Sequence, residues 1–144
     1  MRMVSFWVGL DGMKTVLNEI LEDTSAKELL AFSSVDDLFE LLGKDFTAFV
    51  KKRVAKGLPS RVILRESERA WERVRLEKQE LRHVRLIPPS YEHHGLMHIW
   101  GNRVALSSLK HEWIVLIIES EEVARTMKMI FEALWDSLPV PQLH

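Results

Sequence analysis

Three closely spaced histidines, His93, His94 and His98, are the residues best suited to chemistry. A zinc site needs three or four ligands that converge from rigid positions. The spacing of four between His94 and His98 would suit one helical face, but Gly95 and the apolar pattern after it favour a strand. The chain has no cysteine, and Glu92 is the nearby carboxylate. We therefore predict no metal site and interpret this segment as a polar loop that enters a strand.

Two serine pairs follow apolar segments: Ser33 with Ser34, and Ser107 with Ser108. A hydrolase nucleophile typically lies in a Gly-x-Ser-x-Gly turn, and the sequence contains none. A glycine-rich phosphate loop is also missing from the sequence. The serines are therefore interpreted as residues that end strands and cap helices, and no catalytic residue is predicted.

The segment from Glu66 to Arg85 carries dense charge of both signs. Mixed signs neutralise phosphates inefficiently, so a nucleic-acid surface is disfavoured. The pattern instead indicates a helix capped by Ser67, with most of its surface in water.

Length, composition and net charge limit the classes of protein to which the chain can belong. The chain has 144 residues, of which 47% are apolar and 28% charged, and this predicts one folded domain. Its net charge of −1 differs from the net positive charge that DNA-binding domains usually carry. Cysteine-free composition suits a reducing compartment. No signal peptide is recognisable, and the longest apolar run is far shorter than the roughly 20 residues that span a bilayer. We expect a cytoplasmic protein with no membrane association.

Apolar periodicity predicts the elements that position these residues. Strands are expected over 4–8, 28–32, 61–64, 84–87, 96–100, 103–106 and 113–118. Helices are expected after a cap at Asp11, from Ser34 to Gly57, over 66–85, and from Ser120 to Pro139. Helices separate the early strands and short turns join the later ones. The predicted fold class is therefore α/β, a mixed sheet with helices on both faces in a single domain, 1–144.

In open α/β sheets, ligands bind beyond the carboxyl ends of strands. The polar residues that follow the predicted strands are therefore candidate contacts for a neutral polar ligand such as a sugar. The candidates are Ser33, Ser34, Arg65, Glu66, His98, Ser107, Ser108, Glu119 and Ser120.

Four segments, Gly9–Met13, Leu96–Ser108, Ile117–Ala124 and Ile130–Trp135, together resemble the effector domain of TrmB-type transcriptional regulators. The resemblance implies a phospholipase D-like α/β fold without the lipase or nuclease chemistry. It also implies a small-molecule effector, often a sugar, and a homodimer. Such domains reach DNA through a winged helix-turn-helix, which these 144 residues do not contain.

The resemblance also implies a test for activity, because active relatives carry His-x-Lys followed by Asp. Each histidine of the loop lacks both companions. The required Lys and Asp positions hold Trp100 and Ala105 for His98, Leu96 and Gly101 for His94, and Gly95 and Trp100 for His93. We therefore predict a regulatory, ligand-sensing domain that is not an enzyme and has no cofactor. Two alternatives remain: a diverged phosphodiesterase or nuclease, inactivated by His98→Ala, and a ligand-free interaction module that uses the last helix.

Overall fold

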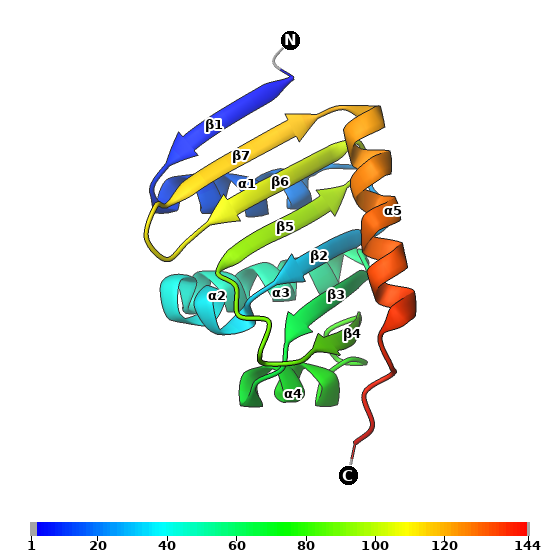
Figure 1. Cartoon of the computed structure of the whole chain (residues 1–144). Helices are drawn as coiled ribbons and strands as arrows, with labels where there is room; N and C mark the ends of the chain where they lie inside the picture. The colour runs from blue at the N-terminus through cyan, green and yellow to red at the C-terminus, as the bar shows by residue number, and fades with distance from the viewer. Residues whose placement is uncertain (1–2, 144) are drawn as a thin grey trace.

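Seven strands form one sheet in the order β1-β7-β6-β5-β2-β3-β4 in this computed structural model (Figure 1). The structure describes residues 3–143, so Met1, Arg2 and His144 lie outside the described residues. The strands are β1 (Val4–Val8), β2 (Leu29–Ser33), β3 (Ser60–Arg65), β4 (Arg82–Ile87), β5 (Gly95–Trp100), β6 (Arg103–Ser108) and β7 (Ile114–Glu119). The helices are α1 (Leu10–Glu22), α2 (Val35–Leu42), α3 (Lys44–Lys56), α4 (Glu68–Arg75) and α5 (Glu121–Ser137).

The sheet is mixed, as predicted. Strands β2, β3 and β4 are parallel neighbours, and the chain crosses between them through α2 and α3, then through α4. Strands β5, β6, β7 and β1 add in antiparallel fashion. The turn between β5 and β6 is Gly101-Asn102, where Gly101 has a φ of 56°, a value that glycine adopts without strain.

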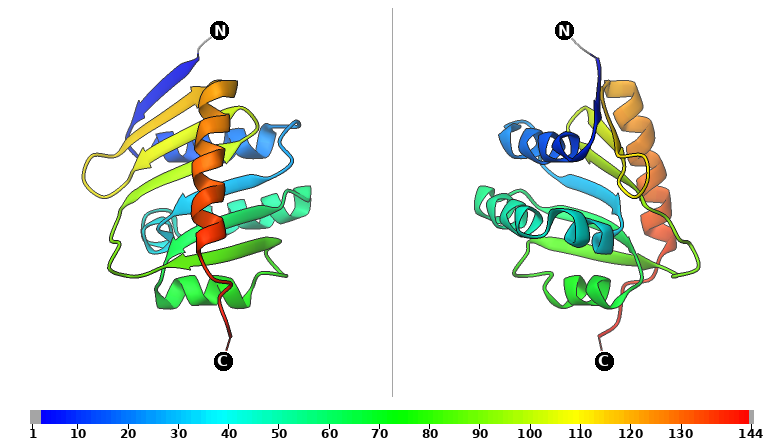
Figure 2. Two further views of the ribbon diagram at one scale, coloured as in Figure 1. Left: turned by 45° about the vertical axis from the view of Figure 1, so that its right-hand side comes forward. Right: turned by 90° about the vertical axis from the view of Figure 1, so that its left-hand side faces the viewer.

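Helices cover both faces of the sheet, which confirms the predicted fold class. Figure 2 shows α1 to α4 on one face and α5 alone on the other. The alternation within β2 separates the two cores: Leu29 and Ala31 pack with the four-helix side, and Leu30 packs with α5. On the α5 side, Trp135 lies beneath the guanidinium groups of Arg61 and Arg85, 5.4 and 4.6 Å from its ring centre.

The single helix predicted from Ser34 to Gly57 is in fact two helices. Gly43 has φ 47° and ψ −115°, which interrupts the helical path between α2 and α3. The apolar spacing continues through the break, so periodicity alone did not reveal it. Gly57 ends α3 in the left-handed conformation, as predicted.

Helix caps were predicted with mixed success. The hydroxyls of Ser67 and Ser120 accept hydrogen bonds from the backbone at the starts of α4 and α5, at 3.1 and 3.2 Å. Asp11 was expected to cap the first helix, but it lies in the first turn of α1, and Gly9 is the cap. Ser34 occupies the cap position of α2 but makes no side-chain capping bond.

The charged segment from Glu66 to Arg85 is less helical and less exposed than predicted. Helix α4 ends at Arg75, and turns follow from residue 76 to Leu81. Leu81 has a φ of 50°, and β4 begins at the next residue. The side chains of Arg73 and Arg82 are buried.

Within the described residues, no helix is long and apolar enough to cross a membrane.

Candidate active site

The carboxyl ends of β2, β3 and β6 meet at one edge of the sheet, where β5 begins. Figure 1 shows these three arrowheads pointing toward the side on which α2 lies. The register supports this placement, because Gly95 of β5 is opposite Ser108 of β6. From the predicted set, Ser33, Ser34, Arg65, Ser107 and Ser108 lie along this edge, although β5 and β2 separate the two serines of β6 from Arg65 of β3.

Glu119 lies at the opposite edge of the sheet, so the prediction that it shares this rim is wrong. Strand β7 runs antiparallel to β6, which brings Glu119 opposite Arg103. An Arg103 Nη2 to Glu119 Oε2 distance of 3.5 Å joins the two side chains, and Arg103 also binds Asp23 at 2.9 Å. Because a short connection reverses the chain between β6 and β7, the carboxyl end of β7 lies at the edge where β6 begins.

His98 is 4% exposed and points into the core between the sheet and the four helices. Burial lowers the pKa of His98 to about 4, so its ring is neutral at pH 7. Ser33 and Ser107 are similarly buried. These three residues are poorly placed to meet a ligand from solvent at the edge, and a phosphodiesterase test at His98 would therefore address an interior residue.

His94, which was not among the predicted ligand contacts, also lies at this edge. It lies just before β5, and its Nδ1 is 2.7 Å from Oδ2 of Asp37 in the first turn of α2. The Asp37 side chain is 13% exposed and that of His94 is 29% exposed. A largely buried carboxylate therefore orients a histidine whose other ring nitrogen is directed toward charged neighbours.

The Nε2 atom of His94 has two such neighbours, the Glu92 carboxylate at 3.3 Å and the Lys110 ammonium at 3.4 Å. When His94 is neutral with its Nδ1–H donated to Asp37, Nε2 can accept a hydrogen bond from Lys110. When His94 is protonated, Nε2 can donate to Glu92. Interaction with His94, followed by the charge of Arg65, lowers the pKa of the Glu92 carboxyl. The site can therefore accommodate both forms of the ring, which acid-base chemistry requires.

Formal charges around the neutral ring balance. Lys110 and Arg65 are cationic, and Asp37 and Glu92 are anionic. Arg65 Nη1 is 3.9 Å from Glu92 Oε1, and the Glu92 side chain is 66% exposed. An ion pair this exposed contributes little to stability, so displacing Glu92 from Arg65 costs little free energy.

The histidines of this loop do not converge on one point. His93 stacks on Phe32 with ring centres 4.5 Å apart, and its Nδ1 is 3.0 Å from the Gly95 carbonyl oxygen. His98 points into the core. Across residues 3–143, no group of three or more His, Cys, Asp or Glu side chains is arranged to hold a metal ion.

The architecture is that of a phospholipase D-like fold. Two solved structures match this chain over nearly their whole lengths. NucT from Helicobacter pylori is 15% identical, with 96% of this chain and 98% of that chain covered and a TM-score of 0.65. Nuc from Salmonella typhimurium, a phospholipase D family member, is 13% identical, with 97% and 98% covered and a TM-score of 0.67.

The archaeal chromatin protein TrmBL2 is also similar, at 15% identity and a TM-score of 0.64. The match covers 98% of this chain and 55% of TrmBL2, so this chain spans about half the length of that protein. No protein-family model and no curated protein matches the sequence. At these identities the likeness establishes the fold, and the expected relation to TrmB-type regulators is supported at that level.

The prediction that this chain is not an enzyme is contradicted. It relied on the missing Lys and Asp companions of the histidines. The end-to-end likeness to NucT and to Nuc, a phospholipase D family member, points instead to a possible enzyme. Companions at a fixed spacing were the basis of that prediction, whereas Asp37 and Lys110 contact His94 from distant parts of the chain.

Proposed function

We propose that this chain is a phosphodiesterase of the phospholipase D-like class, with His94 as its catalytic residue. The observation that carries the proposal is the His94–Asp37 pair at the carboxyl edge of the sheet, with Lys110 beside Nε2. Ligands of open α/β sheets bind at this edge. The likeness to Nuc supports the same class.

In the proposed mechanism, neutral His94 donates its Nδ1–H to Asp37 and presents the Nε2 lone pair to phosphorus. Asp37 stabilises the positive charge that develops on the ring as the phosphorus–nitrogen bond forms and the bond from phosphorus to one ester oxygen breaks. The alkoxide that leaves takes a proton from water. Lys110 and Arg65 offset the charge on the phosphoryl oxygens. Water then attacks the phosphorus, the phosphorus–nitrogen bond breaks with its electron pair returning to Nε2, and the phosphomonoester leaves with a neutral histidine restored.

His94→Ala is expected to reduce hydrolysis of bis(p-nitrophenyl) phosphate by at least about 100-fold, because the nitrogen that attacks phosphorus is lost. Release of p-nitrophenol by purified protein measures the rate. His83→Ala is the matched control, because the His83 side chain is 77% exposed on β4, and its rate should equal that of wild type.

Asp37→Asn should lower the rate less than His94→Ala and change its pH profile, because the ring loses its carboxylate partner. Equal rates for wild type and His94→Ala, or no turnover by wild-type protein, would refute the proposal.

A second candidate function is supported by the likeness to TrmBL2. In this alternative, we propose that the chain is a homodimeric domain of a longer regulator and that it binds a small effector. Arg65 and Ser108, which are both accessible, would contact the effector.

The supporting surface is on β1, where Val4, Phe6 and Val8 are each more than half exposed. They alternate with Trp7, which packs against the core on the four-helix side, so they lie on the face that carries α5. Exposed apolar patches of this kind are typical of interfaces.

Sedimentation velocity tests the dimer. Phe6→Glu is expected to convert a dimer into a monomer, because it places a charge in the apolar patch. Tyr91→Glu, at a residue 66% exposed outside β1, should leave the dimer intact. A wild-type protein that sediments as a monomer at high concentration would rule this interface out.

A further inference from the structure

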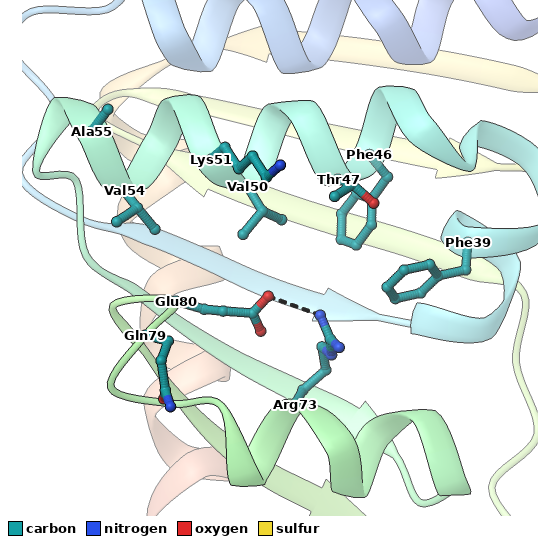
Figure 3. A pocket seen from close by; sticks show the side chains of 10 residues that line it. All are labelled: Phe39, Phe46, Thr47, Val50, Lys51, Val54, Ala55, Arg73, Gln79 and Glu80. Atoms are coloured by element: carbon teal, nitrogen blue, oxygen red, sulfur yellow. Dashed lines mark hydrogen bonds and ion pairs between the residues drawn. The ribbon is translucent and has the colours of Figure 1, made fainter.

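A pocket of about 470 Å³ opens between α3 and the segment that follows α4, away from His94. Figure 3 shows apolar side chains of α2 and α3 facing Arg73 and Glu80 across it. Phe39, Phe46, Val50 and Val54 form the apolar wall. The rings of Phe39 and Phe46 meet edge to face, with centres 5.2 Å apart. The pocket is large enough for a small organic molecule.

The interior beside this pocket holds more positive than negative charge. Arg53, Arg73 and Arg82 are 1%, 7% and 8% exposed. Glu80 bridges two of them, at 2.8 Å to Arg73 and 3.1 Å to Arg82, and its side chain is 15% exposed. Glu72 adds a contact of 3.5 Å to Arg73 but is 55% exposed. Buried charges are normally paired, so a further anion would be stabilised here.

Several buried polar atoms near the charged end lack partners among the described residues. Arg73 is a residue of the pocket wall, and its buried Nε atom makes no hydrogen bond. Behind it, an inner space of about 30 Å³ shares Phe46 and Arg73 with the pocket and extends to Ser33 and His98. Ser33 Oγ and His98 Nδ1 are also unpartnered. An inner space of this size holds about one water molecule, so the bulk of a ligand would stay in the outer pocket.

We propose that this pocket binds a small organic anion, an acidic group carried on a flat apolar body. The acidic group contacts Arg73 and the apolar body packs against Phe39, Phe46 and Val50. Lys51 stands at the same wall and adds positive charge at the opening. Carboxylates and phosphates share the chemistry that a guanidinium recognises, and the planar fork of Arg73 suits either one.

Isothermal titration calorimetry with three naphthalene probes tests the proposal. We expect 2-naphthoate or 2-naphthyl phosphate to bind at least about 10-fold more tightly than uncharged 2-naphthalenemethanol. That ratio corresponds to about 1.4 kcal/mol. The tighter of the two anions identifies the acidic group. His94→Ala protein should bind them as wild type does, which separates this pocket from the proposed active site.

Matched variants locate the binding. Lys51→Trp fills the opening, whereas Lys52→Trp makes the same change at an exposed position outside the pocket lining. Lys51→Trp should weaken anion binding at least about 10-fold, equivalent to about 1.4 kcal/mol, and Lys52→Trp should not. Equal binding by these variants, equal affinity for the uncharged probe, or no binding at millimolar concentrations would overturn the proposal.

Discussion

Arg53→Met is expected to lower the free energy of unfolding by about 3–5 kcal/mol, because a buried carbonyl group left without its donor costs about 1–3 kcal/mol and Arg53 bonds three of them. Arg53 Nη1 donates to the carbonyl oxygens of Leu58 and Leu81, at 2.8 and 3.1 Å, and Nη2 donates to that of Glu80. These bonds tie the end of α3 to the turn before β4. Methionine retains much of the apolar bulk but leaves the buried carbonyl groups without a donor.

The urea midpoint at pH 7 measures this loss, with Lys52→Met as the neighbouring exposed control. Typical domains have a total stability of only about 5–15 kcal/mol, so the Arg53 variant should be close to unfolding at 37 °C. Arg53→Lys should recover part of the loss, because an ammonium group carries the charge without the planar fork. An Arg53→Met midpoint equal to that of the control would mean that the buried contacts contribute little.

The sequence predicted the sheet well because burial and periodicity coincide there. The hairpin of β5 and β6 was recognised from two apolar runs around Gly101-Asn102, and the structure has these strands with the same turn. The final helix was recognised from Ser120 and the wide stripe that includes Phe131 and Trp135. Both are buried against the sheet in α5. Local pattern and tertiary packing favour the same structure in these segments.

The buried arginines were missed because a charged side chain was assumed to be solvated. The sequence did contain a signal: Arg73 lies three residues after Ala70 and next to Val74, on the buried face of α4. Arg53 likewise shares the inner face of α3 with Phe49 and Val50. An arginine at an apolar position of a helix predicts a buried contact when a carboxylate or free carbonyl groups lie within reach.

The candidate site was predicted only in part because strand direction and distant contacts are tertiary properties. Ser33 and Arg65 are the last residues of parallel strands, so their shared edge could be inferred. Glu119 is the last residue of β7, which runs opposite to β6, so Glu119 lies at the other edge of the sheet. His94 gains its role from Asp37, which is 57 positions earlier in the chain and carries no sequence motif that links the two.

Acidification should destabilise wild-type protein more than a His98→Gln variant, by up to about 3 kcal/mol at pH 4. The folded protein holds the pKa of His98 at about 4 because its ring is fully buried, whereas an unfolded histidine titrates near 6.5. The unfolded chain therefore binds the proton first. The His98 contribution to stability is fully present above pH 6.5 and is lost as the pH falls from 6.5 toward 4.

Urea unfolding of both proteins at pH 7, 5.5 and 4 isolates this contribution, because acid titration of the carboxylates is common to both. Glutamine is neutral over this range, so the gap between the two stability curves reports on His98 alone. His83→Gln serves as the control, since His83 is exposed and its variant should follow wild type. Parallel curves for wild type and His98→Gln would show that His98 takes up its proton as readily in the folded core as in water.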